Sequence, residues 1–174
     1  MGDPKRIELH GGQAQKEEQK NARKERPMEK IGESLIVNYN GNEAAVSNLI
    51  NSKKIVILKF SSAWCGPCLE QERNLKKMAK NNDASLKDIL VVDIDIDFHP
   101  TQGYKIHSQG NPIGMRYNLF RGKSGLGCVL FVDGKKKEWA QYPYEEDGLK
   151  VVGLGTSEEE LRRMLNNVRK KVGK

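Results

Sequence analysis

Residues 54–68 read KIVILKFSSAWCGPC and are the most informative part of the sequence about the fold. The run IVILKF near its start is apolar except for Lys59 and is typical of a strand that is buried on both faces of a sheet. Two cysteines follow, and the chain after them predicts a helix that ends near Lys80. Pro67 suits the first turn of that helix, because the N–H groups of a first turn are unpaired in any case. The stretch therefore predicts a buried strand that leads directly into a helix opened by Cys65 and Cys68.

Further segments extend this pattern into an α/β fold. Residues 90–96 alternate in polarity and predict a second strand, parallel to the first because a helix connects the two. Residues 128–132 predict a third strand. Asp133-Gly134 then predicts a tight hairpin, because a type I′ turn needs two residues that tolerate a positive φ. We expect the returning strand at about residues 136–142.

Two more helices are predicted outside this unit. Asn42 is a suitable N-cap for a helix that runs through Ile50. Thr156 to Glu159 reads as a capping box at the start of the last helix. Its apolar residues form one stripe, which predicts a face packed on the core: Leu161, Met164, Leu165 and Val168.

The two cysteines have the spacing and the position that thiol chemistry needs. Free N–H groups and the helix dipole favour an anion at a helix N-terminus, where Cys65 is expected. In Cys-X-X-Cys motifs this environment lowers the pKa of the thiol and produces the nucleophilic thiolate. Cys65 is therefore predicted to attack a substrate disulfide, and Cys68 to resolve the mixed disulfide that results. No organic cofactor is needed.

A zinc site is the alternative interpretation of a single Cys-X-X-Cys pair. Its remaining ligands would be Cys128 and one of the histidines, none of which has ligand spacing: His10, His99 and His107. We therefore expect no bound metal. Cys128 is interpreted as a small buried apolar residue, since free cysteines are among the most buried residue types.

The WCGPC motif, its preceding strand and the hairpin–helix ending together resemble thioredoxin over about residues 34–174. The resemblance implies a central mixed β-sheet flanked by helices, with the dithiol at the tip of a central strand. It also implies that Trp64 shields the active site and that Cys65 is the attacking thiol. Gly66 and Pro67 between the cysteines resemble the reducing members of the family.

Lys59 departs from the thioredoxin pattern, which has a buried aspartate six residues before the first cysteine. The pattern places a lysine on the next strand, where this chain has Asp93. We hypothesise that the pair is exchanged, with Lys59 and Asp93 in contact beneath the dithiol. The alternative is a Lys59 side chain that extends to solvent.

A second departure concerns the cis-proline that thioredoxins place before the third strand and use to present backbone groups to the substrate. The matching loop here is Gly125-Leu126-Gly127. Without proline a trans loop is expected, because other cis peptide bonds cost about 2.5–4 kcal/mol. The loop and the glycine-rich insertion at about residues 98–127 are expected to form part of the substrate-docking surface. The missing proline also leaves room for a metal ion at the cysteines.

Composition sets the domain organisation. Residues 1–33 are polar, with few large apolar side chains, and predict a flexible tail before the domain at 34–174. The net charge of +7 is spread along the chain, with its only cation-rich end in the last helix, so no nucleic-acid partner is expected. No apolar run is long enough to span a membrane, and no secretory signal is visible, so we expect a cytoplasmic location. We also expect a monomer.

The sequence thus predicts a protein thiol–disulfide oxidoreductase that reduces protein disulfides and takes electrons from an unidentified donor. Two alternatives stay open. One is a thioredoxin-fold binding module in which the dithiol is vestigial or acts as a redox switch. The other is a metal-binding thioredoxin-like protein.

Overall fold

The computed structural model describes residues 27–62, 65–99, 103–104, 111–113, 128–137, 145–146, 149–150 and 155–173. The strands are β1 (Glu29–Ile31), β2 (Leu35–Tyr39), β3 (Ile55–Ser61), β4 (Ile89–Asp95), β5 (Phe98–His99), β6 (Gly103–Tyr104), β7 (Cys128–Val132), β8 (Lys135–Lys137), β9 (Glu145–Glu146) and β10 (Leu149–Lys150). The helices are α2 (Glu43–Ile50), α3 (Gly66–Lys80) and α5 (Glu158–Val172), with a short 3-10 helix, η1 (Ala84–Leu86). Within the described part of the chain, no helix has the length and apolar character needed to cross a membrane.

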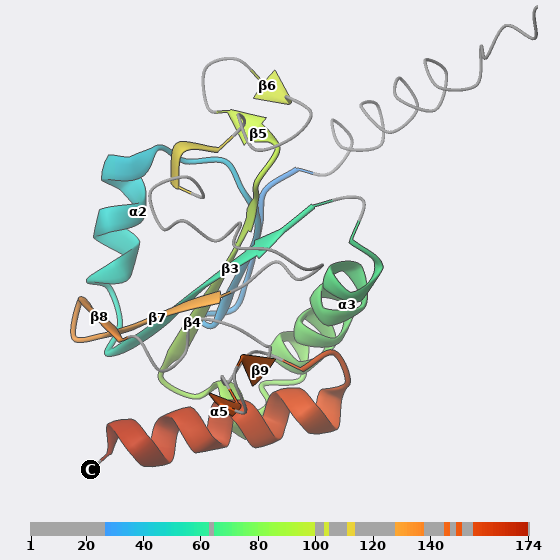
Figure 1. Cartoon of the computed structure of the whole chain (residues 1–174), viewed down its shortest axis with the longest axis vertical. Coiled ribbons are helices and arrows are strands. Elements are labelled where there is room, and N and C mark those ends of the chain that lie inside the picture. The colour runs from blue at the N-terminus through green and yellow to red at the C-terminus, as the bar shows by residue number, and fades with distance from the viewer. Residues whose placement is uncertain are drawn as a thin grey trace, which may run out of the picture.

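A mixed six-stranded sheet organises the domain, in the order β1-β2-β4-β3-β7-β8 (Figure 1). Strand β4 is parallel to β3, as predicted for the two strands that α3 connects. It is also parallel to β2. Strand β7 runs antiparallel to β3. The carboxyl ends of β3 and β4 and the amino end of β7 therefore lie at the same edge of the sheet.

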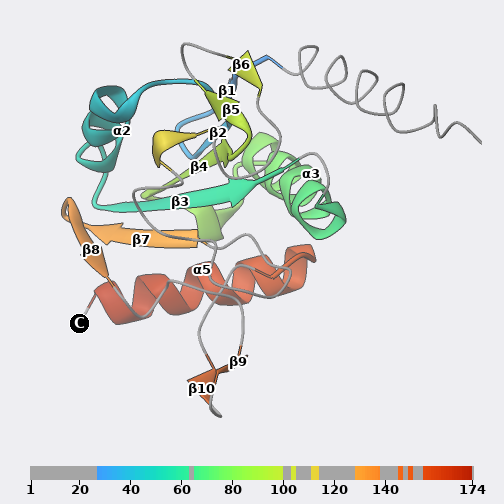
Figure 2. The ribbon, with the colours of Figure 1, turned by 45° about the horizontal axis from the view of Figure 1, so that its top comes forward.

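Helices cover both faces of the sheet. Alternation along β3 directs Ile57 toward the core that α3 and α5 complete, and Leu58 toward the core that α2 completes. Figure 2 shows this arrangement, with α2 on one side of the sheet and α5 on the other. Because both faces of β3 are covered, its seven residues are all buried, which explains the continuous apolar run in the sequence.

The hairpin between β7 and β8 has the predicted turn. Asp133 and Gly134 have φ values of 49° and 73°, so both adopt the left-handed conformation that a type I′ turn requires. A Cβ atom on Gly134 would also collide with the Asn51 side chain. Both the positive φ and this close contact therefore favour glycine at position 134. The return strand begins at Lys135, one residue earlier than predicted, and the expected continuation through 138–142 lies outside the described residues.

The N-terminal boundary predicted from the sequence needs correction. Glu29–Ile31 belong to the sheet and not to a tail, because they form β1, which pairs with β2 in an antiparallel hairpin. Gly32 turns this hairpin with a φ of 58°, and Ile31 is buried against the core on the α3 side. Strand pairing with β2 and an ion pair between Glu29 and Lys76 hold this otherwise polar segment together with the burial of Ile31. Residues 1–26 lie outside the described residues.

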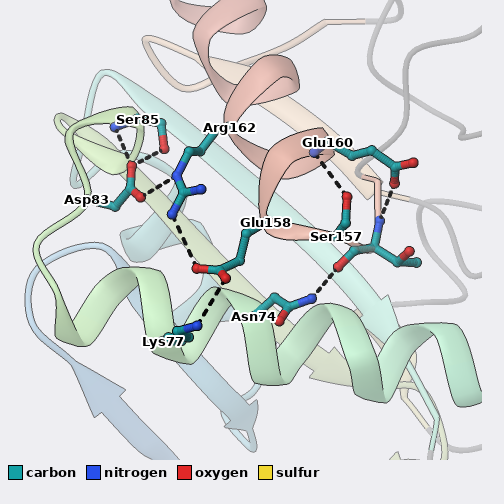
Figure 3. A network of polar contacts seen from close by, with 9 residues as sticks. Asn74, Lys77, Asp83, Ser85, Ser157, Glu158, Glu160 and Arg162 are labelled. Carbon is teal, nitrogen blue, oxygen red and sulfur yellow. Dashed lines mark hydrogen bonds and ion pairs between the residues drawn. The ribbon is translucent and has the colours of Figure 1, made fainter.

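A polar network fastens the start of α5 to α3 and η1 (Figure 3). The N-cap of α5 is Ser157, whose Oγ accepts a hydrogen bond from the Glu160 N–H at 3.2 Å. Glu160 in turn accepts from the Thr156 N–H at 2.9 Å. The capping box is thus one residue later than the predicted Thr156–Glu159. Asn74 of α3 donates to the Thr156 carbonyl at 2.7 Å, which ties the two helices together.

Asp83 is the centre of the other half of this network. Its carboxylate accepts hydrogen bonds from Ser85 and, at 2.7 Å, from Arg162 of α5. Burial of the carboxyl group tends to raise the pKa of Asp83, but the hydrogen bonds from Ser85 and Arg162 outweigh that effect and hold the pKa below its usual value. The ionised carboxylate is therefore the form that joins η1 to α5.

Candidate active site

The two cysteines lie where the buried strand β3 passes into α3. Cys65 is the N-cap of α3, with extended backbone angles of φ −88° and ψ 97°. Its Sγ accepts a hydrogen bond from the Cys68 N–H at 3.2 Å. The two residues form a disulfide, with Cα atoms 5.1 Å apart. The structure thus places the predicted pair at a helix N-terminus, in its oxidised form.

The environment of this helix N-terminus favours a negative charge. The first turn of α3 carries no acidic residue, whereas its last turn carries Lys77 and Lys80. The positive end of the helix dipole is therefore left for the sulfur at the N-cap, where a reduced Cys65 would be stabilised as the thiolate. Gly66 is exposed, and open space surrounds the position of its missing Cβ.

The two sulfur-bearing residues differ in accessibility. Cys65 is half-buried, whereas Cys68 is only 5% exposed. A nucleophile has to reach an external disulfide, but a resolving thiol only has to reach its neighbour. This difference in burial is what the predicted roles of Cys65 and Cys68 require.

Lys59 and Asp93 form a buried ion pair on adjacent strands. They are register partners on the parallel pair β3–β4, and Lys59 Nζ lies 2.7 Å from Asp93 Oδ2. Their side chains are 1% and 3% exposed. The contact proposed from the sequence is therefore present, and Lys59 does not extend to solvent.

Two further hydrogen bonds connect this pair to its surroundings. Ser61 Oγ donates to Asp93 Oδ1 at 2.5 Å, so both carboxylate oxygens are engaged. Lys59 Nζ also donates to the backbone carbonyl of Cys68, at 3.4 Å. The ammonium group thus lies directly beneath the resolving cysteine.

Asn111 anchors the insertion to the edge of the sheet that carries the dithiol. Its N–H donates to the Ile96 carbonyl at 2.9 Å, and its side-chain amide donates to the Asp95 carbonyl at 3.3 Å. The Asn111 side-chain oxygen accepts from the Ile113 N–H. Both Asn111 and Ile113 are buried. The sequence analysis missed Asn111; the dipeptide Asn-Pro, a turn signal at 111–112, is the feature that could have indicated it.

The remaining predicted site residues are distributed as follows. Pro67 and Gly66 form the first turn of α3, as expected. Trp64 and the loop Gly125-Leu126-Gly127 lie outside the described residues, as do residues 114–124 of the insertion. Among described residues there is no cis peptide bond, and no group of three or more His, Cys, Asp and Glu side chains is arranged to hold a metal ion.

Cys128 is a buried thiol outside the disulfide, 6% exposed. It is the register partner of Lys59 on β7, so Asp93, Lys59 and Cys128 occupy one row across three neighbouring strands. Its burial agrees with the interpretation of Cys128 as a core residue.

Comparison with known proteins shows which of them this chain resembles. The Thioredoxin family model matches residues 37–117. Thioredoxin-1 of Drosophila melanogaster is 34% identical over 65 residues, which are 37% of this chain and 60% of that protein. Thioredoxin H8 of Arabidopsis thaliana is 32% identical over 62 residues, or 36% of this chain and 39% of that protein. The chain therefore spans less than two thirds of the length of these relatives.

Two solved structures share the fold. An N21Q mutant thioredoxin from Halobacterium salinarum has a TM-score of 0.50 at 22% identity, over 80% of this chain and 94% of that one. Thioredoxin from Trypanosoma brucei brucei also gives 0.50, at 16% identity, over 83% and 98%. At such identities the likeness concerns the arrangement of the sheet and helices.

Proposed function

Because the chain belongs to the thioredoxin superfamily, we propose that it is a protein thiol–disulfide oxidoreductase that reduces disulfides of other proteins. The observation that supports this most is the placement of Cys65. It caps a helix with no acid in its first turn, and it is the more accessible member of a Cys-X-X-Cys disulfide. We propose further that the protein acts as a cytoplasmic monomer on protein disulfides and receives electrons from a separate donor.

The proposed reaction has two displacement steps. The Cys65 thiolate attacks one sulfur of the substrate disulfide, forms a mixed disulfide with it, and releases the other sulfur as a thiolate. Cys68 then attacks the Cys65 sulfur and releases the second substrate sulfur as a thiolate. The proton of the Cys68 thiol passes to a released thiolate. Two electrons move from the dithiol to the substrate, and the protein is left with the disulfide seen in the structure.

The insertion at 98–127 is our candidate for substrate docking. It leaves the sheet after β4 and returns at β7, both at the edge that carries the dithiol. Asn111 holds a part of it against Asp95 and Ile96 at that edge. We propose that the predicted loop Gly125-Leu126-Gly127, which immediately precedes β7, contributes to the same surface, with Trp64 shielding the dithiol.

Trapping the intermediate tests the proposed function. Cys68→Ser should accumulate a mixed disulfide through Cys65 when the reduced variant meets a protein disulfide, because the second step is blocked. Cys65→Ser should form no such adduct and should lose turnover with dithiothreitol as the electron source. Intact-protein mass spectrometry measures the adduct. An adduct through Cys128, or turnover that persists in Cys65→Ser, would refute the assignment and favour a binding module.

A further inference from the structure

The buried ion pair beneath the dithiol is oriented, and its positive end lies against Cys68. Lys59 Nζ contacts the Cys68 carbonyl at 3.4 Å, whereas the hydrogen bonds of the Asp93 carboxylate go to Lys59 and Ser61. The pair is neutral as a whole. However, Lys59 Nζ contacts both the Asp93 carboxylate and the Cys68 carbonyl, so the positive end of the ion pair's dipole faces Cys68. This orientation favours a negative charge at Cys68. Both side chains are almost fully buried, so water screens this field very little.

The charged and titratable groups around Cys68 come from three elements besides β3. Strand β4 supplies Asp93 and strand β7 supplies the Cys128 thiol, on either side of Lys59. Helix α3 supplies Cys65 and, one turn beyond Cys68, the buried Glu72. Glu72 is paired with Lys76 at 3.4 Å. Lys59 is therefore the cation in direct contact with Cys68 among the described residues.

An ammonium group donates hydrogen bonds and cannot accept one, so Lys59 in this form cannot remove the proton of Cys68. We propose that Lys59 is a positioning residue: a fixed cation that stabilises the thiolate of Cys68 and so prepares the resolving thiol for its attack on Cys65. This rests on the proposed function for its catalytic meaning, but the ionisation of Cys68 can be measured without turnover. Asp93 has the supporting role of holding Lys59 in place and offsetting the cost of burying its charge.

The chemical consequence concerns the second step of the exchange. The Cys68 thiol loses its proton to solvent or to the first released substrate thiolate, and the Cys68 thiolate then attacks the Cys65 sulfur of the mixed disulfide. The bond between Cys65 and the substrate breaks, and the substrate sulfur leaves with the electron pair. Lys59 lowers the energy of the thiolate that makes this attack, and its own charge is unchanged throughout.

The test compares three proteins with the wild type. Lys59→Met/Asp93→Asn removes both charges together, so that no unpaired carboxylate remains buried; Lys59→Met alone is expected to fold poorly for that reason. Lys59→Arg retains the cation and is the rescue variant. Lys136→Met, which removes an exposed lysine on the β8 hairpin, is the matched control. Isotope-labelled cysteine Cβ resonances of the reduced proteins report the pH at which Cys68 ionises.

We expect the ionisation constant of Cys68 to fall at least tenfold in Lys59→Met/Asp93→Asn, to be largely restored in Lys59→Arg, and to stay unchanged in Lys136→Met. At a pH above the Cys68 midpoints of both proteins, the equilibrium with glutathione should shift tenfold toward the disulfide form in the double variant, which is about 30 mV for this two-electron couple. A merely structural pair would change the unfolding midpoint but not these quantities. A Cys68 midpoint within threefold of wild type in a folded double variant would overturn the proposal. That result would leave the Cys65-dependent turnover, and so the proposed function, standing.

Discussion

Helices α3 and α5 begin in the same way but serve different ends. Each has 15 residues, and each is capped by a side chain that accepts a hydrogen bond, at 3.2 Å, from the N–H three residues later. In α5 the cap is Ser157, followed by three glutamates that complement the helix dipole. In α3 the cap is Cys65, followed by Gly66 and Pro67 and no acid.

The same backbone feature, a capped helix N-terminus, is thus structural in α5 and is proposed to be reactive in α3. In α5 the glutamates and the Ser157 cap already satisfy the positive end of the helix, so it contributes stability. In α3 that end is left without a charged partner from the first turn, so it is available to a thiolate. Four predictions test this interpretation of the two helix starts.

The largest effect is expected from Cys65→Ser, which makes the start of α3 resemble that of α5. Disulfide exchange should fall to the uncatalysed rate, because no nucleophile remains. The unfolding free energy of the reduced protein should change by less than about 1 kcal/mol, because serine is itself a good N-cap. Urea denaturation and an insulin-type reduction assay measure the two quantities. A loss of several kcal/mol would mean that the comparison of the two caps is wrong.

Gly66→Glu places an acid in the first turn of α3, at the position that Glu158 has in α5. The exposed site has room for the side chain. The added charge should raise the pKa of the reduced Cys65 thiol by roughly half a unit to one unit, because it competes for the helix dipole. At a pH below the pKa of Cys65, the rate of its alkylation should therefore fall by roughly three- to tenfold, in proportion to the smaller thiolate fraction.

Salt and a neutral variant control this second experiment. The effect should shrink as salt is added, because the new charge is exposed, and Gly66→Gln should alkylate at the wild-type rate. Equal slowing by Gln and Glu would show that side-chain bulk, and not charge, is responsible.

Ser157→Ala removes the cap of α5 and should affect stability alone. The expected cost is about 1 kcal/mol of unfolding free energy, because the Glu160 N–H loses its acceptor. The exchange rate should stay at the wild-type value, since this helix start takes no part in the chemistry. A change in the Cys65 alkylation rate would mean that the two helix starts are coupled through Asn74 and Thr156.

The smallest effect is a pH dependence that comes from Asp83. Its pKa is lowered in the folded protein, so the carboxylate stabilises the fold above the pH at which an unfolded Asp ionises. That contribution should be lost as the pH falls from the pKa of an unfolded Asp through the lower pKa of the folded protein. Asp83→Asn should therefore flatten the acid limb of the stability curve, measured by urea denaturation at a series of pH values. An unchanged slope would show that the network in Figure 3 does not depend on the charge of Asp83.

Local patterns predicted the elements that build the site. The apolar run of β3, the Cys-X-X-Cys start of α3 and the Asp133-Gly134 turn each depend on neighbours in sequence, and each is present. The Lys59–Asp93 contact could be anticipated because register on adjacent parallel strands sets it, once the thioredoxin pattern aligned the two positions.

Contacts between distant segments could not be predicted in this way. The hydrogen bonds of Asn111 to Asp95 and Ile96 join a loop to the end of a strand, and no periodic pattern in the loop sequence predicts them. Strand β1 was missed for a related reason. Its polar residues lie at an edge of the sheet, where the turn at Gly32, the burial of Ile31 and the distant ion pair between Glu29 and Lys76 accompany its pairing.

The reduction potential of the Cys65–Cys68 couple is the decisive measurement for a reducing thiol–disulfide oxidoreductase. Reduced and oxidised populations would be counted by mass spectrometry after alkylation in graded thiol–disulfide buffers, with Cys65→Ser as the baseline. We predict one reversible two-electron transition nearer to about −270 mV, the value of thioredoxin, than to about −180 mV. A transition between about −180 and −120 mV would contradict a reducing role, and the absence of any reversible transition would contradict thiol–disulfide exchange itself.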